Sequence, residues 1–106
     1  MEYFHLSDID GKEIIPGFKG RFIHSENMTF VYWDIEADAS LPEHSHPHEQ
    51  VTSVIEGELD LTVDGESKKI GPGSVIIVPP NAVHSGKAII NSRIIDVFYP
   101  IREDYR

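Results

Sequence analysis

At 106 residues the chain has room for one domain around one core, and we expect residues 1–106 to form that domain. Its 18 acidic and 9 basic residues give a net charge of −9, which disfavours nucleic acid and anionic membranes as partners. It has no cysteine, which excludes disulfides and thiolate metal ligands and fits a reducing compartment. The N-terminal segment has no apolar run and no stretch is long enough to span a membrane, so we expect a cytoplasmic protein.

Short strands separated by turns are predicted from residue 28 onward. Residues 28–36 are rich in β-branched and aromatic side chains, as strands are. Residues 50–56 predict a second strand, and residues 58–63 alternate apolar and polar side chains like a half-buried strand. The dipeptide Asp64-Gly65 then predicts a two-residue hairpin turn.

The second half of the chain continues this pattern. A break at residues 71–73 precedes the apolar run 75–78. Residues 90–99 predict the last long strand, which ends at Pro100 because proline cannot donate to a strand ladder. Residues 102–106 allow a helix of one or two turns. Many short strands with tight turns and no amphipathic helix indicate an all-β sandwich or barrel.

Two segments carry side chains suited to metal binding. His44 and His46 are two residues apart, so on an extended strand they point to the same side. Gln50 follows a proline kink, and His84 arrives on a separate segment after a Pro-Pro turn. We predict that these three imidazoles and the amide oxygen converge on one divalent metal ion.

The ligand chemistry leaves the identity of the metal open. Imidazole accepts nickel, zinc, iron, manganese and cobalt, and an octahedral ion with four protein ligands would keep two positions for water or substrate. Glu49 is the rival of Gln50 for the fourth position, because the kink at Pro47 breaks the alternation. The plainer interpretation is a histidine-rich surface loop, and His48 fits that interpretation.

The last strand contains an aspartate where one is disfavoured. Alternation places Ile94, Asp96 and Phe98 on one face. If that face is interior, a carboxylate near a metal suits a general acid or base. Arg102 could return over the mouth of the barrel and bind a carboxylate through two nitrogens. The structural alternatives are a hydrogen bond to a loop for Asp96, core packing for Phe98 and a solvated charge for Arg102.

Both metal-binding segments resemble the motifs of the cupin superfamily. Residues 44–57, H-S-H-P-H-E-Q-V-T-S-V-I-E-G, resemble the first motif, and counting back from Gly57 puts Gln50 at the ligand position. Residues 73–84, G-S-V-I-I-V-P-P-N-A-V-H, resemble the second motif. The resemblance implies a single-domain cupin-type double-stranded β-helix, a jelly-roll barrel. Glutamine replaces the usual glutamate of the motif, which argues against dioxygenase-type activity.

Three stretches resemble one cupin family in particular, the small cupins of pectin and alginate degradation. They are G-R-F-I-H-S-E-N-M-T, L-P-E-H-S-H-P-H-E-Q and D-V-F-Y-P-I-R-E-D-Y. Those proteins open the ring of unsaturated uronate monosaccharides, with three histidines and a glutamine on the metal and an aspartate, a phenylalanine and an arginine completing the site. By motif position the resemblance implies the metal ligands His44, His46, Gln50 and His84 and the catalytic residues Asp96, Phe98 and Arg102.

We therefore expect a metal-dependent cupin enzyme whose partner is a small anionic sugar, converted to its linear keto form. Two alternatives are a non-catalytic sugar- or metabolite-binding module and an oxygen-using cupin dioxygenase. We also expect a homodimer. A strand candidate around Tyr3–Leu6 has no obvious partner in the chain, and an unpaired strand edge invites pairing with a second subunit.

Overall fold

A computed structural model describes residues 1–106, which form ten strands and two short 3-10 turns. Strand accounts for 55% of the chain and helix for 6%, so the predicted all-β class is confirmed. The strands are β1 (Lys12–Ile15), β2 (Phe18–His24), β3 (Thr29–Ile35), β4 (Ser40–His44), β5 (Glu49–Glu56), β6 (Leu59–Val63), β7 (Glu66–Ile70), β8 (Val75–Val78), β9 (His84–Ala88) and β10 (Ser92–Tyr99). No helix of the structure is long and apolar enough to cross a membrane.

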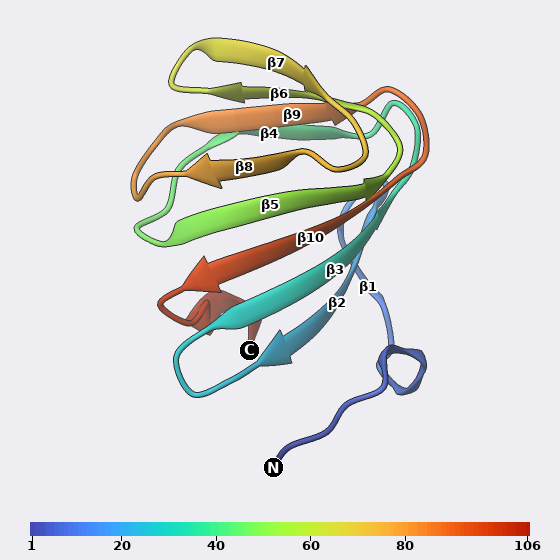
Figure 1. The fold of residues 1–106 in the computed structure, drawn as a ribbon, viewed down its shortest axis with the longest axis vertical. Helices are drawn as coiled ribbons and strands as arrows, with labels where there is room; N and C mark the ends of the chain where they lie inside the picture. The colour runs from blue at the N-terminus through green and yellow to red at the C-terminus, as the bar shows by residue number, and fades with distance from the viewer.

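The strands form two antiparallel sheets that face each other as a jelly-roll barrel (Figure 1). The larger sheet has the order β1-β2-β3-β10-β5-β8, and the smaller has the order β4-β9-β6-β7. The chain crosses from one sheet to the other between β3 and β4, between β4 and β5 and between β5 and β6. It crosses again between β7 and β8, between β8 and β9 and between β9 and β10. Strands far apart in sequence therefore lie side by side, with β10 between β3 and β5.

The strands predicted at residues 28–36, 50–56 and 58–63 correspond to β3, β5 and β6. The predicted hairpin at Asp64-Gly65 joins β6 to β7, with φ angles of 47° and 81° at the two turn residues. Positive φ at both central positions matches the twist of a two-residue hairpin, which explains the choice of aspartate and glycine.

The sequence analysis gave no bounds for β1, β2, β4, β7 and β9, and three of these strands are sheet edges. These are β1, β4 and β7, each of which pairs on one side only. Most of their residues are exposed or half-buried, and β7 buries only Ile70. Their sequences therefore lack the apolar alternation that reveals a strand buried on one face.

The strand predicted around Tyr3–Leu6 is wrong. Residues 1–5 form no regular element, and Leu6–Asp8 forms a 3-10 turn, η1. The His5 ring accepts the Ser7 backbone N–H through Nδ1 at 3.2 Å, and its carbonyl accepts the Asp8 N–H at 2.9 Å. A local side-chain bond of this kind satisfies donors that a strand would need for pairing. The helix of one or two turns that residues 102–106 allow is a single 3-10 turn, η2 (Glu103–Tyr105).

The core lies between the two sheets. Phe18 on β2 and Trp33 on β3 pack edge to face, with ring centres 6.0 Å apart. Val31, also on β3, is completely buried. On β10 the alternation predicted from sequence is confirmed, because Ile94 and Phe98 are buried. The same inward face carries the polar residues described next.

Candidate metal centre

A cavity of about 170 Å³ lies between the sheets. The strand register separates its apolar part from its polar part. Phe98 on β10 lies opposite Gln50 on β5, whereas Ile94 lies opposite Val54 and Trp33. The polar side chains therefore gather at the Phe98 end, around three histidines that line the cavity.

The structure brings His44, His46 and His84 together although forty positions separate the first from the last. His44 ends β4 and His84 begins β9, directly opposite each other in the smaller sheet. His46 lies in the connection to β5. One ring nitrogen of each histidine lies within 4.8 Å of those of the other two. The two segments predicted to supply ligands thus meet in one place.

Backbone carbonyls orient all three rings in the same way. Each Nδ1 faces a carbonyl oxygen two residues away, at 2.8 Å for His44, 3.1 Å for His46 and 2.9 Å for His84. Since a carbonyl can only accept, Nδ1 carries the proton and Nε2 keeps a lone pair. This is the tautomer that a metal-binding imidazole needs.

Gln50 adds an oxygen to this set. Its amide nitrogen donates to Thr52 Oγ1 at 2.9 Å and to Asp96 Oδ1 at 3.2 Å, so Oε1 faces His46 Nε2 at 3.0 Å. With Nδ1 protonated, both of these facing atoms are acceptors. His84 Nε2 is buried and has no hydrogen-bond partner at all. A cation would satisfy these atoms, so the donor set fits a divalent metal ion.

The structure separates Gln50 from its rival Glu49. Gln50 is buried in the cavity, whereas Glu49 is exposed at the start of β5. Strict alternation through β5 also buries Thr52 and Val54. The kink at Pro47 lies before the strand and does not disturb its alternation. The alternation of buried and exposed positions along β5 could therefore have identified Gln50 as an inward-facing residue.

Burial keeps the imidazoles in the neutral form. Burial and then the nearby Arg102 charge lower the pKa of His46 from 6.5 to about 4. Burial likewise lowers the pKa of His84. A neutral imidazole is the form that binds metal.

Asp96 lies behind Gln50 and is almost completely buried. It accepts hydrogen bonds from Thr52 Oγ1 at 2.5 Å and from Trp33 Nε1 at 2.9 Å, in addition to the bond from Gln50. Burial raises the pKa of the Asp96 carboxyl, and the three hydrogen bonds oppose that rise. The contacts join Asp96 to the proposed ligand set, and they exclude the loop contact considered as its structural alternative.

Arg102 lines the cavity and is only 7% exposed, so it is not a solvated tail charge. Its guanidinium carbon lies 4.8 Å from the ring centre of Phe98. The guanidinium binds a carboxylate through two nitrogens, but that carboxylate is Asp104, with Nε–Oδ1 at 2.9 Å and the second contact at 2.7 Å. The hydrogen bond from Arg102 lowers the pKa of Asp104. The sequence analysis did not identify Asp104 as a partner of Arg102, although it lies only two residues further along the chain, in the segment R-E-D.

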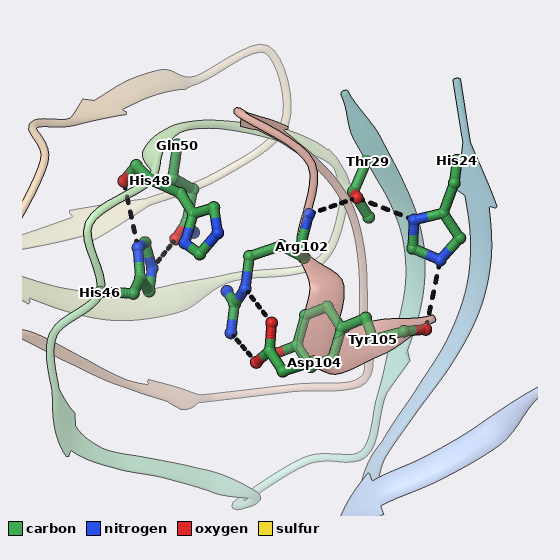
Figure 2. A network of polar contacts seen from close by, with 8 residues as sticks. All are labelled: His24, Thr29, His46, His48, Gln50, Arg102, Asp104 and Tyr105. Carbon is green, nitrogen blue, oxygen red and sulfur yellow. Dashed lines mark hydrogen bonds and ion pairs between the residues drawn. The ribbon is translucent and has the colours of Figure 1, made fainter. Parts of the chain in front are cut away.

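A chain of hydrogen bonds holds this C-terminal segment against the larger sheet (Figure 2). The Arg102 backbone N–H donates to Thr29 Oγ1 at 2.8 Å. Thr29 Oγ1 lies 2.8 Å from His24 Nδ1, and His24 Nε2 lies 3.2 Å from the Tyr105 carbonyl oxygen. The Tyr105 carbonyl must accept, so His24 carries its proton on Nε2 and Thr29 donates to Nδ1. Neither Thr29 nor His24 stood out in the sequence.

Comparisons with known proteins agree with this arrangement. The cupin domain family matches residues 31–98. The chain is similar to the structure of KdgF from Halomonas sp., with a TM-score of 0.94 and 25% identity over 100% of this chain and 99% of that one. It is also similar to an RmlC-like cupin from Shewanella frigidimarina, with a TM-score of 0.92 and 30% identity over 100% and 97% of the two chains. A protein of Streptomyces coelicolor is 26% identical over 102 residues, which cover 94% of this chain and 97% of the relative.

Proposed function

The chain belongs to the cupin domain family, and from that premise we propose that it is a metal-dependent enzyme that opens the ring of unsaturated uronate monosaccharides. Such a sugar carries a carboxylate, a hemiacetal hydroxyl and a double bond conjugated to the ring oxygen. Ring opening is an isomerisation. The hemiacetal hydroxyl loses a proton, the ring C–O bond breaks, and a carbon of the double bond gains a proton as the enol becomes a ketone.

The observation that carries the proposal is the buried carboxyl group of Asp96 beside the amide of Gln50. The reaction needs a group that exchanges a proton with the substrate inside the cavity. Burial raises the pKa of Asp96, which favours a carboxyl that holds a proton to donate. Thr52 and Trp33 fix its orientation through their hydrogen bonds.

The charge of the ligand set supports an anionic substrate. Three imidazoles and an amide are neutral, so they leave a divalent ion uncompensated. When bound, the ion would supply Lewis-acid polarisation of substrate oxygens. A uronate brings the missing negative charge to the site through its own carboxylate.

Arg102 and Phe98 would bind and enclose the sugar. The guanidinium of Arg102 is suited to a carboxylate, and the substrate would exchange with Asp104 at that position. Phe98 packs edge to face against His46, with ring centres 5.6 Å apart, and would wall that side of the site off from water. The cavity of about 170 Å³ is smaller than the roughly 300–1,000 Å³ of drug-sized sites, which suits a monosaccharide.

The test is to incubate the metal-loaded protein with unsaturated galacturonate and follow the loss of its ultraviolet absorbance. We expect a rate above that of spontaneous ring opening. The variant Asp96→Asn, which keeps the size of the side chain, should lose about 100-fold or more of that rate and still bind metal. No acceleration with nickel, zinc, iron, manganese or cobalt would exclude the proposed activity. Binding of the sugar without turnover would instead identify a binding module.

A further inference from the structure

One end of the cavity is lined by apolar side chains that the candidate metal centre does not use. On the smaller sheet the register stacks the inward residues in layers, and His44 pairs with His84 in the first of them. In the next layer Gly86 pairs with Leu41 on β4 and with Leu61 on β6. All three residues of this second layer line the same cavity as the histidines. We call the part of the cavity beside Leu41, Gly86 and Leu61 the apolar end.

The larger sheet adds no free polar side chain to the apolar end. Ile94 and Phe18 line the cavity there and are buried. The Trp33 indole N–H and the Thr52 hydroxyl both donate to Asp96, so neither is left for a ligand. A ligand hydroxyl at the apolar end would therefore lose its hydrogen bonds with water and find no side chain to replace them.

Gly86 keeps the centre of the second layer open. Its φ angle is not positive, so the backbone conformation does not require glycine. A β-carbon at this position would lie 3.6 Å from Leu61 Cδ1 and 3.3 Å from the Asp60 carbonyl oxygen. A larger side chain would extend from there into the cavity. Glycine weakens a strand interior, and it often marks a place that a ligand approaches closely.

The two leucines on either side of Gly86 are incompletely covered. Leu41 and Leu61 pack against the core cluster, yet both are only half-buried. Apolar atoms of a ligand placed over Gly86 would cover them further. Each methylene group that a ligand buries strengthens its binding by about fourfold.

We propose that the apolar end is a binding subsite for carbon atoms without hydroxyl groups, in a small ligand whose opposite end is a carboxylate. The cavity offers both parts of such a ligand a matching surface. Arg102 and the candidate metal ligands lie at the polar end and suit the carboxylate. Gly86 leaves the room that the carbon atoms need at the other end.

This subsite also gives the proposed function a basis for selectivity, and that part of the inference rests on the proposed function. A saturated uronate carries a hydroxyl on the ring carbon where the unsaturated sugar has its double bond. Burying that hydroxyl without a partner should weaken binding by roughly 10–100-fold. The unsaturated sugar places only carbon at the same position.

Calorimetry on the nickel-loaded protein tests the subsite without any turnover. The probes are acetohydroxamate and butyrohydroxamate, which share a metal-binding group and differ by two methylenes. Butyrohydroxamate should bind about tenfold more tightly. Its analogue with a terminal hydroxyl, 4-hydroxybutyrohydroxamate, should lose that gain. Equal affinity of the first two probes would overturn the proposal, and so would an analogue that binds as tightly as butyrohydroxamate.

Gly86→Val should remove the advantage of butyrohydroxamate and leave the affinities for nickel and acetohydroxamate within about twofold. Gly86→Ala adds a single carbon and should remove part of the advantage, which keeps the test available if the valine variant does not fold. Ser85→Val is the matched control, since alternation puts residue 85 on the opposite face of β9. An undiminished advantage in the folded Gly86 variants would contradict the proposal.

Xenon binding to the metal-free protein provides a test that is independent of the ion. Apolar cavities take up xenon, so dissolved xenon should shift the methyl NMR signals of Leu41 and Leu61. The shifts should persist in Ser85→Val and shrink in Gly86→Val. Unshifted signals in the wild-type protein would refute the subsite. A protein that passes these binding tests and fails to open the sugar ring would retain the subsite and lose the proposed function.

Discussion

Among single residues, the candidate ligand histidines show how burial prepares a side chain for metal. His46 has a pKa of about 4, so between pH 4 and 6.5 the unfolded chain binds a proton at this position that the folded chain does not. The stability contributed by neutral His46 is complete above pH 6.5 and is lost as pH falls toward 4. The same burial that costs stability in acid keeps the imidazole available to a metal.

Metal binding should therefore persist in mild acid. For three imidazoles of pKa 6.5, lowering the pH from 7.5 to 5.5 would weaken binding roughly 1,000-fold through proton competition. The lowered pKa values of His46 and His84 predict a much smaller loss. Competition titration with nickel at both pH values measures it, with circular dichroism as the control for folding. A full 1,000-fold loss would contradict the effect of burial.

Asp104 is the residue that most alters the picture of the site. Its carboxylate occupies both nitrogens through which Arg102 would bind a substrate. Arg102 is thus held in position with its charge compensated, which reduces the cost of burying it. A uronate carboxylate offers the guanidinium the same chemistry as Asp104.

Among the elements, the polar chain from His24 to Tyr105 links β2 and β3 to η2 (Figure 2). Thr29, at the start of β3, is completely buried and is the central member of this chain. Its hydroxyl accepts from the Arg102 backbone and donates to His24. The position of Arg102 over the cavity thus depends on a strand that contributes no ligand.

Thr29→Val keeps the shape of the side chain and removes both hydrogen bonds. Leaving the Arg102 N–H and His24 without their partner should lower the free energy of unfolding by about 1–3 kcal/mol, measured by urea denaturation. For the proposed reaction, KM should rise more than kcat falls, because the carboxylate-binding residue loses its support. Thr62→Val, at a half-buried position of β6 whose hydroxyl contacts Ser67 and not the C-terminal segment, is the control and should change stability by less than about 1 kcal/mol. An equal effect of both variants would exclude a special role for Thr29.

For the whole molecule, the candidate metal centre joins the two sheets. His44 and His84 lie on β4 and β9 of the smaller sheet, whereas Gln50 lies on β5 of the larger one. A metal bound to all of them would link the two halves of the barrel. It would bind the folded chain alone, because the unfolded chain does not bring these side chains together.

Metal should accordingly raise thermal stability. At a free metal concentration 100 times the dissociation constant, the expected gain is about 2.7 kcal/mol, which raises Tm by roughly 10 °C or more. Differential scanning calorimetry with and without a chelator measures this gain. Gln50→Leu should reduce it, whereas Glu49→Leu, at the exposed neighbouring position, should not. An unchanged Tm in the presence of metal would argue against the site.

Much of the fold could be predicted because it depends on local properties. Alternation on β10 placed Asp96 and Phe98 on the inner face, and Asp64-Gly65 specified a hairpin. The edge strands β1, β4 and β7 could not be found this way, because most of their residues are exposed or half-buried and show no apolar alternation. The strand predicted around Tyr3–Leu6 failed because a local turn satisfied its donors.

The sequence by itself determined which side chains are available for metal chemistry and the spacing that lets them meet, since ligand type and strand period are properties of neighbouring residues. Only the tertiary structure decided what each of them contacts. It set Gln50 rather than Glu49 in the cavity, paired Arg102 with Asp104, and tied Thr29 to a segment far along the chain. These contacts follow from how the two sheets pack, and packing depends on all of the strands at once.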